Sequence, residues 1–127
     1  MISHITTSSE NYLEVIYDLV RSGPAHSIDV ASRMGVSKAS VNKAIGVLRH
    51  AGMIEQQLYG TITLTKEGES RAKEVVRRHS TIKRFLIKVL EVDEQTADED
   101  ACRMEHVVSN KTMAKWTNYL ESELKKR

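Results

Sequence analysis

Two short stretches with helical spacing, separated by one glycine, most constrain how this chain can fold. The first stretch lies before Gly35 and has the apolar residues Ile28, Val30, Ala31 and Met34. The second lies after Gly35 and has Val41, Ile45 and Leu48. Residues three or four apart share one face of a helix, so each stretch predicts a short amphipathic helix. Gly35 favours the end of the first helix, and Ser37 can cap the second. The segment therefore predicts two helices joined by a tight turn.

The hydrophobic period changes after Met53, in the stretch "MIEQQLYGTITLTKEG". Threonine and isoleucine are frequent there, and Tyr59 with Gly60 supplies turn residues, which together predict a small β-hairpin. Upstream, "TTSSENYLEVIYDLVRSG" has a Ser/Thr cluster followed by apolar residues at helical spacing. The order helix, helix-turn-helix, hairpin is typical of a winged helix-turn-helix domain, whose second paired helix enters the DNA major groove.

The exposed face of that second helix carries the chemistry that DNA recognition needs. Lysine ammonium groups bind phosphates, serine and asparagine side chains hydrogen-bond to base edges or backbone, and an alanine methyl can contact thymine. The candidate DNA-binding residues are Ser37, Lys38, Ala39, Ser40, Asn42 and Lys43. An ordinary solvated helix has a similar surface, but the order of the surrounding elements favours double-stranded DNA as the partner.

The remainder of the chain predicts helices only. A long helix follows Lys66, the acidic stretch "EVDEQTADEDA" leads into another helix, and "NKTMAKWTNYLESELKKR" predicts the last. We expect Asp98, Glu99 and Asp100 at the positive N-terminal end of the middle helix. The predicted fold is mainly α, with a winged helix-turn-helix domain over residues 1–72 and a helical region over residues 73–127.

Composition and charge exclude several classes of protein. Apolar residues make up 40% of the chain and charged residues 28%, which is normal for a soluble globular protein. No run approaches the roughly 18 apolar residues that span a bilayer, and the N-terminus lacks the pattern of a signal peptide. We therefore expect a cytoplasmic protein without a membrane partner. The net charge of +2 does not by itself indicate nucleic-acid binding.

The stretch "ACRMEHVVS" gathers a thiol, a carboxylate and an imidazole. On a helix, Cys102, Glu105 and His106 would share one face and form half of a metal site. Candidates for the other half are Glu10, Asn11 and Glu14 on the first helix and His79 on the long one. Such donors suit a divalent transition metal. Taken singly, a lone cysteine is more often a small buried hydrophobe and a lone histidine more often structural.

The sequence resembles the diphtheria toxin repressor family of metal-dependent transcriptional regulators, which includes the manganese transport regulators. The resemblance covers essentially the whole chain and is carried by "SSENYLEVIYDL", "DVASRMGVSKASVNKAIGVL", "LTKEGESRAKEVVRRH" and "DEDACRMEHVVS". It implies a winged helix-turn-helix followed by a helical dimerisation and metal-binding region. An "ACRWEH"-like segment supplies metal ligands in the iron-responsive branch. The match implies ligand roles for Cys102, Glu105 and His106, and for His79 from its "RRH" context.

The chain combines features of two branches of that family. Asn11 matches a first-helix ligand that is Met in the iron branch and Asp in the manganese branch, and its amide oxygen is a weaker donor. Glu14 matches a ligand of the manganese branch, whose counterpart of Cys102 is a carboxylate. Lys83 and Asp98 stand where the iron branch has an accessory-site glutamate and histidine, so that site looks altered, although an Asp98 or Glu99 oxygen could still contribute. Without an SH3-like domain after the last helix, the chain looks like the short manganese regulators.

The donor set favours one metal over the others. Thiolate and imidazole ligands favour Fe(II), Zn(II) or Co(II) over Mn(II), so we expect Fe(II), with Mn(II) as the alternative and Zn(II) or Co(II) binding in vitro. What the resemblance then implies is an iron(II)-activated homodimeric repressor of metal-uptake genes that binds operator DNA. A manganese-responsive repressor of the same family is the alternative function.

Two other functions would also use Cys102. The first is a DNA-binding oxidation sensor, but Glu105 disfavours a thiolate there and the chain has no second cysteine to resolve an oxidised one. The second is a cysteine hydrolase that uses Cys102 with His106, but no orienting group or oxyanion hole is identifiable in so small a helical chain. We therefore expect neither enzyme activity nor a small organic substrate.

Overall fold

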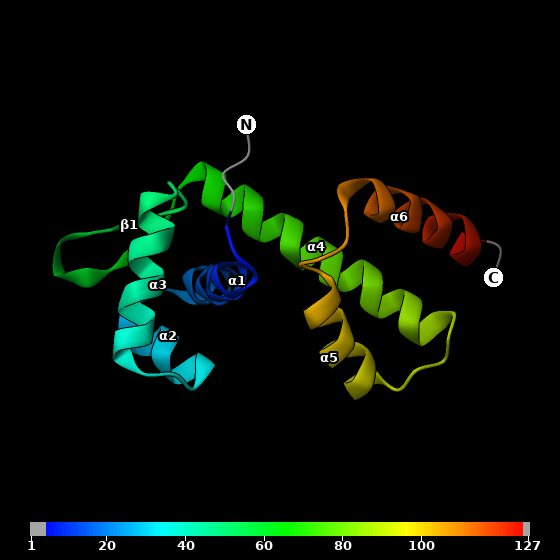
Figure 1. The fold of residues 1–127 in the computed structure, drawn as a ribbon, viewed down its shortest axis with the longest axis horizontal. Coiled ribbons are helices and arrows are strands. Elements are labelled where there is room, and N and C mark those ends of the chain that lie inside the picture. The colour runs from blue at the N-terminus through cyan, green and yellow to red at the C-terminus, as the bar shows by residue number, and fades with distance from the viewer. Residues whose placement is uncertain (1–4, 126–127) are drawn as a thin grey trace. The chain divides into compact units, whose positions relative to one another are not determined.

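The computed structural model describes residues 5–125, and the chain forms two compact units, Met1–Lys73 and Glu74–Arg127. The elements in chain order are α1 (Thr7–Ser22), α2 (Ser27–Met34), α3 (Lys38–His50), β1 (Ile54–Gln56), the 3-10 turn η1 (Leu58–Gly60), β2 (Ile62–Leu64), α4 (Lys66–Lys88), α5 (Glu94–Met104) and α6 (Asn110–Lys125) (Figure 1). This confirms the predicted class, mainly helical with one small hairpin. No helix within residues 5–125 is long and apolar enough to cross a bilayer.

The helices of the first unit begin and end at the predicted local signals. Thr6 accepts a hydrogen bond from the Ser9 amide at 3.1 Å, and Ser37 accepts one from the Ser40 amide at the same distance. Both contacts satisfy amides at a helix N-terminus that have no partner within the helix. Gly35 ends α2 in the left-handed region, at φ 65°, which glycine adopts without steric cost. The tight turn between α2 and α3 therefore follows from local sequence.

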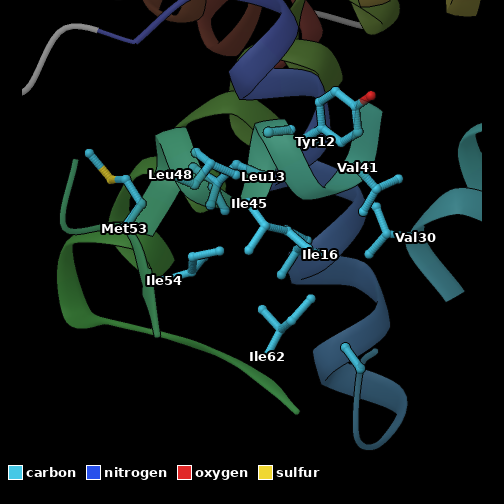
Figure 2. Close-up of a cluster of buried hydrophobic side chains, with 13 residues drawn as sticks. Tyr12, Leu13, Ile16, Val30, Val41, Ile45, Leu48, Met53, Ile54 and Ile62 are labelled. Atoms are coloured by element: carbon cyan, nitrogen blue, oxygen red, sulfur yellow. The ribbon is translucent and has the colours of Figure 1, made fainter. Parts of the chain in front are cut away.

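The core of the first unit joins α1, α2, α3 and the hairpin (Figure 2). Leu13 and Ile16 from α1 meet Leu48 from α3 and the hairpin residues Ile54 and Ile62, and all five are buried. Removing these large apolar side chains from water is the main stabilising contribution to the unit. The α3 surface opposite this core stays in solvent.

The hairpin is antiparallel, with Ile54 opposite Leu64 and Gln56 opposite Ile62. Figure 1 shows it extending away from α3. The Ile62 amide also donates to the carbonyl oxygen of Ala25 at 2.8 Å, which adds an isolated bridge to the outer side of β2. Backbone pairing therefore fixes the start of β2, next to the turn of the hairpin, to the segment between α1 and α2.

Gly68 lies where the start of α4 packs on the backbone before β1. The Gly68 amide donates to the Thr65 hydroxyl at 3.0 Å, and the Thr65 amide donates to the Met53 carbonyl oxygen at 3.1 Å. A Cβ atom added to Gly68 would lie 1.8 Å from that same carbonyl oxygen. Because the obstructing atom is backbone, only glycine fits at this contact.

In the second unit, α5 and α6 pack on α4 around a separate core. Ala97 and Ala101 present small side chains to Ile82 and Leu86, and the rings of Phe85 and Trp116 meet edge to face with centroids 5.2 Å apart. The middle helix begins earlier than the sequence predicts. Asp93 caps it by accepting a hydrogen bond from the Thr96 amide, so Asp98, Glu99 and Asp100 lie beyond the first turn and not at the N-terminal end.

Candidate metal centre and nucleic-acid interface

The segment with the thiol, carboxylate and imidazole spans the end of α5 and the turn after it. Cys102 lies in the helix, Glu105 is its C-cap with helical backbone angles, and His106 belongs to the following turn. The prediction that all three share one helical face is therefore wrong in detail, because the helix ends at Met104. Glu105 keeps the position relative to Cys102 that a continued helix would give it, since its amide still donates to the Ala101 carbonyl oxygen.

Arg78 on α4 fixes this turn, a role that the sequence analysis missed. Its guanidinium donates to the Glu105 carbonyl oxygen at 2.9 Å, to the Val108 carbonyl oxygen at 2.5 Å and to Asn110 Oδ1 at 2.5 Å. The side chain is only 13% exposed. These contacts satisfy carbonyl groups at the helix end that have no partner within α5. The sequence did carry a signal for this role, because Arg78 comes three residues after the apolar Val75 and so shares its face of α4.

Glu105 is a carboxylate buried without ordinary stabilisation. Its residue exposure is 1%, and neither carboxylate oxygen has a hydrogen-bond partner in the described part of the chain. His79 Nδ1 lies 3.4 Å from Oε2, and His106 Nε2 lies 3.4 Å from Oε1. A buried charge is costly unless it is paired or binds a metal. The carboxylate therefore needs positive charge, which an imidazolium or a bound cation can supply.

His79 is held between two carboxylates. Its Nε2 lies 2.8 Å from Asp98 Oδ1, on the opposite side of the ring from Glu105. The Glu105 carboxylate, and more weakly Asp98, raises the pKa of His79 to about 9, although burial opposes the charged form. At neutral pH the metal-free protein therefore carries an imidazolium here. A metal at Nδ1 would replace that proton.

We expect the metal-free protein to lose stability as pH rises from 6.5 to 9. Because the pKa of His79 is raised by folding, its protonation stabilises the native state fully below the unfolded value and ceases to do so above about 9. Melting temperatures measured in chelator across this range should fall, and His79→Asn should remove that part of the slope. The matched variant His50→Asn changes an exposed histidine of α3 and should keep it. Equal slopes in all three proteins would contradict the assignment.

The donor atoms around Glu105 are of the kinds that bind a divalent transition metal. Ligand atoms that bind one ion at about 2.1 Å lie roughly 3 to 3.5 Å apart in tetrahedral geometry, which matches the spacing of Glu105 from each imidazole. The atoms with no hydrogen-bond partner include both Glu105 oxygens and His79 Nδ1. Among residues 5–125, no group of three or more His, Cys, Asp and Glu side chains is placed so that it could hold a metal ion as it stands. The arrangement is thus two carboxylate–imidazole pairs centred on Glu105.

The remaining predicted ligands lie on α5 and α1. Cys102 is half-buried and free of any disulfide, one helical turn before Glu105. Asn11 and Glu14 are half-buried and share one face of α1 in the first unit. The structure brings His79, Glu105 and His106 together within the second unit. The participation of Cys102, Asn11 and Glu14 at the same ion stays a prediction.

The predicted DNA-contacting residues all lie exposed at the N-terminal half of α3. They occupy the surface opposite the buried face of that helix, and they are Ser37, Lys38, Ala39, Ser40, Asn42 and Lys43. Ser37 also caps the helix, and its hydroxyl donates to Ser40 Oγ at 3.0 Å. Two ammonium groups beside hydroxyl and amide side chains can bind phosphate and base edges. Their contacts with DNA stay a prediction.

Comparison with known proteins concerns both the candidate metal centre and the candidate DNA-binding surface. Residues 4–62 match the family model described as the iron-dependent repressor N-terminal DNA-binding domain, and residues 65–123 match the one described as the iron-dependent repressor metal-binding and dimerisation domain. Together the two models cover nearly the whole chain, and the gap between them, residues 63–64, lies in β2.

Individual relatives give the same picture. The chain is 32% identical over 119 residues to an uncharacterised HTH-type transcriptional regulator of Methanocaldococcus jannaschii, covering 92% of this chain and 95% of that one. It is 41% identical over 105 residues to the transcriptional regulator MntR of Escherichia coli O157:H7, covering 82% and 67%. The solved structure of the manganese regulator SloR superposes with a TM-score of 0.81 at 27% identity, covering 92% of this chain and 55% of that one. The chain therefore spans about half the length of that solved relative.

Proposed function

Because this chain belongs to the iron-dependent repressor family of metal-dependent transcriptional regulators, we propose that it is a homodimer whose affinity for operator DNA rises when a divalent metal binds. The observation that carries this proposal is the buried Glu105 carboxylate, whose two oxygens have no hydrogen-bond partner among residues 5–125 and face one imidazole each. The relatives of this chain are described as transcriptional regulators, and the role proposed here needs no catalysed reaction.

The proposed ligands come from three helices and one turn. They are Asn11 and Glu14 on α1, His79 on α4, Cys102 on α5, and Glu105 with His106 at its end. A divalent ion held by these residues would supply positive charge beside the buried Glu105 carboxylate. His79 would bind it through the deprotonated Nδ1, and Arg78 holds the backbone of the turn in place.

Iron(II) is the metal that we propose first. Cys102 is the only thiol of the chain, and thiolate with imidazole favours Fe(II), Zn(II) or Co(II) over Mn(II). Relative affinity does not identify the metal sensed in the cell, because zinc and copper bind most nitrogen and sulfur sites more tightly than iron. The physiological effect that we propose is repression of metal-uptake genes when iron is sufficient.

Manganese(II) is the second candidate, and two observations support it. A solved relative is described as a manganese regulator, and Glu14 adds a carboxylate oxygen to the proposed set. Oxygen donors suit manganese better than thiolate does. The choice therefore depends on whether Cys102 or Glu14 contributes more to the bound ion.

The experiment that tests the function is DNA binding measured by fluorescence anisotropy under anaerobic conditions, with promoter fragments at fixed ionic strength. The metal-free protein in chelator is compared with protein given Fe(II), Mn(II) or Zn(II). Metals that favour the DNA-binding conformation should tighten binding by about 5- to 150-fold, and DNA should tighten metal binding by the same factor. Selective tightening by Fe(II) supports the thiolate site and selective tightening by Mn(II) the oxygen-rich one. Equal affinity under every condition would refute metal control, and a peroxide effect in metal-free protein would favour the oxidation sensor.

Replacing Lys43 by Ala should weaken DNA binding several-fold on every sequence tested. Lys43 is exposed on α3, and the loss of one phosphate contact should lower the slope of log affinity against log salt by about 1. Metal stoichiometry should not change. Lys111→Ala removes an exposed lysine from α6 and should leave DNA affinity unchanged. Equal losses in both variants would assign the effect to net charge and not to the α3 surface.

A further inference from the structure

Asp98 is joined to two cationic side chains of α4 at the surface of the second unit. Its Oδ1 atom lies 2.8 Å from His79 Nε2 and 3.2 Å from Lys83 Nζ. The Lys83 ammonium also lies 3.6 Å from Glu94 Oε1. Because His79 Nδ1 faces Glu105, a continuous chain of charged groups runs from Lys83 through Asp98 and His79 to the buried carboxylate.

The two ends of this chain meet different surroundings. Lys83 and Asp98 border a shallow surface depression with Glu94 and Gln95, and the Asp98 side chain is 53% exposed. The Glu105 side chain at the other end is fully buried. Water therefore reaches Asp98 but not Glu105. His79, with 24% of its side chain exposed, lies between the two.

We propose that Asp98 is a positioning residue that orients the His79 ring so that Nδ1, and not Nε2, is presented to a metal at Glu105. This inference rests on the proposed function. A histidine that binds a metal through one ring nitrogen usually donates the N–H of the other nitrogen to a carboxylate, which fixes both the tautomer and the ring orientation. The 2.8 Å contact places Asp98 at the required nitrogen.

Lys83 separates this role from that of a metal ligand. Its ammonium lies against the same Asp98 oxygen that contacts His79, and a metal bound there would be repelled at short range. The Lys83 ammonium group thus neutralises the Asp98 carboxylate, and no metal ion is needed there. Asp98 acts on the ion through the imidazole and does not itself bind it.

The test is cobalt(II) binding to the full chain, followed by visible spectroscopy and by competition with a chelator of known affinity. Asp98→Ala should weaken cobalt affinity about 10- to 100-fold, the usual cost of losing such a partner. Asp98→Asn keeps an acceptor oxygen and should recover part of the loss. At saturation both variants should show the wild-type cobalt bands, because the ligand set is unchanged. Asp100→Ala removes another α5 carboxylate, which pairs with Arg103 at 2.8 Å, and should bind cobalt like wild type.

Each other result has a defined meaning. Wild-type affinity in both Asp98 variants would overturn the positioning role while leaving the proposed function intact. Altered cobalt bands at saturation would also overturn it, because they would make Asp98 a ligand. Wild-type protein that binds no cobalt would overturn the proposed function and this inference with it. Thermal melting of the metal-free variants checks folding, and if Asp98→Ala does not fold, the isosteric Asp98→Asn decides alone.

Discussion

Replacing Glu105 by Gln should abolish the metal-dependent gain in DNA affinity and leave the metal-free protein folded. The amide offers one neutral oxygen in place of a charged carboxylate, so we expect metal affinity to fall by at least about 100-fold, which exceeds the 10- to 100-fold typical of losing a supporting residue. Metal concentrations that saturate the wild type then give no tightening on DNA. The measurement is anisotropy with and without metal, together with thermal melting in chelator.

The metal-free variant should remain stable because the substitution also removes a costly buried charge. Glu105 is fully buried, and His79 can return to its neutral form once the carboxylate is gone. Glu121→Gln is the matched control, since it makes the same change at an exposed position of α6 and should keep the full metal response. A Glu105→Gln protein that responds to metal like wild type would refute the central ligand role.

Replacing Gly68 by Ala should destabilise the first unit by at least about 2 kcal/mol. The new Cβ would lie 1.8 Å from the Met53 carbonyl oxygen, and a backbone atom cannot move aside by changing a rotamer. The start of α4 would have to shift away from the backbone before β1, which breaks the hydrogen bond from the Thr65 amide. The higher helix propensity of alanine offsets only about 1 kcal/mol of this loss. Urea denaturation of the metal-free protein measures the change.

Gly46→Ala is the matched control for this prediction. Gly46 lies within α3 and has no atom within 4 Å of an added Cβ, so the same substitution should stabilise the protein by about 0.5 to 1 kcal/mol. Opposite signs for the two variants would establish the steric cause. A Gly68→Ala protein as stable as wild type would show that α4 can rearrange at its start.

Local signals in the sequence predicted the first unit well. Ser37 and Gly35 set the turn between α2 and α3 through contacts that involve only near neighbours. The change of hydrophobic period predicted the hairpin for the same reason. Ile28, counted in the apolar stripe of α2, is 76% exposed, because so short a helix buries only Val30 fully.

The second unit was harder to predict, because distant residues determine its details. α5 ends at Met104 beside carbonyl groups that Arg78 binds from about 30 residues away. The contact between Asp98 and His79 joins residues 19 apart on different helices. Motif spacing predicted which residues could bind a metal, but a one-dimensional pattern does not contain these pairings. The predicted metal-ligand and DNA-contact sets themselves stay predictions.

The hydrogen bond between Ile62 and Ala25 also bears on how the first unit folds. Ala25 is fully buried, so its carbonyl oxygen has no access to water and depends on an amide that comes 37 positions later in the chain. A fragment that stops before the hairpin would leave that oxygen unsatisfied and would lack Ile54 and Ile62 from the core. We therefore expect helices α1 to α3 alone to be unstable, and the first unit to fold cooperatively only with the hairpin in place.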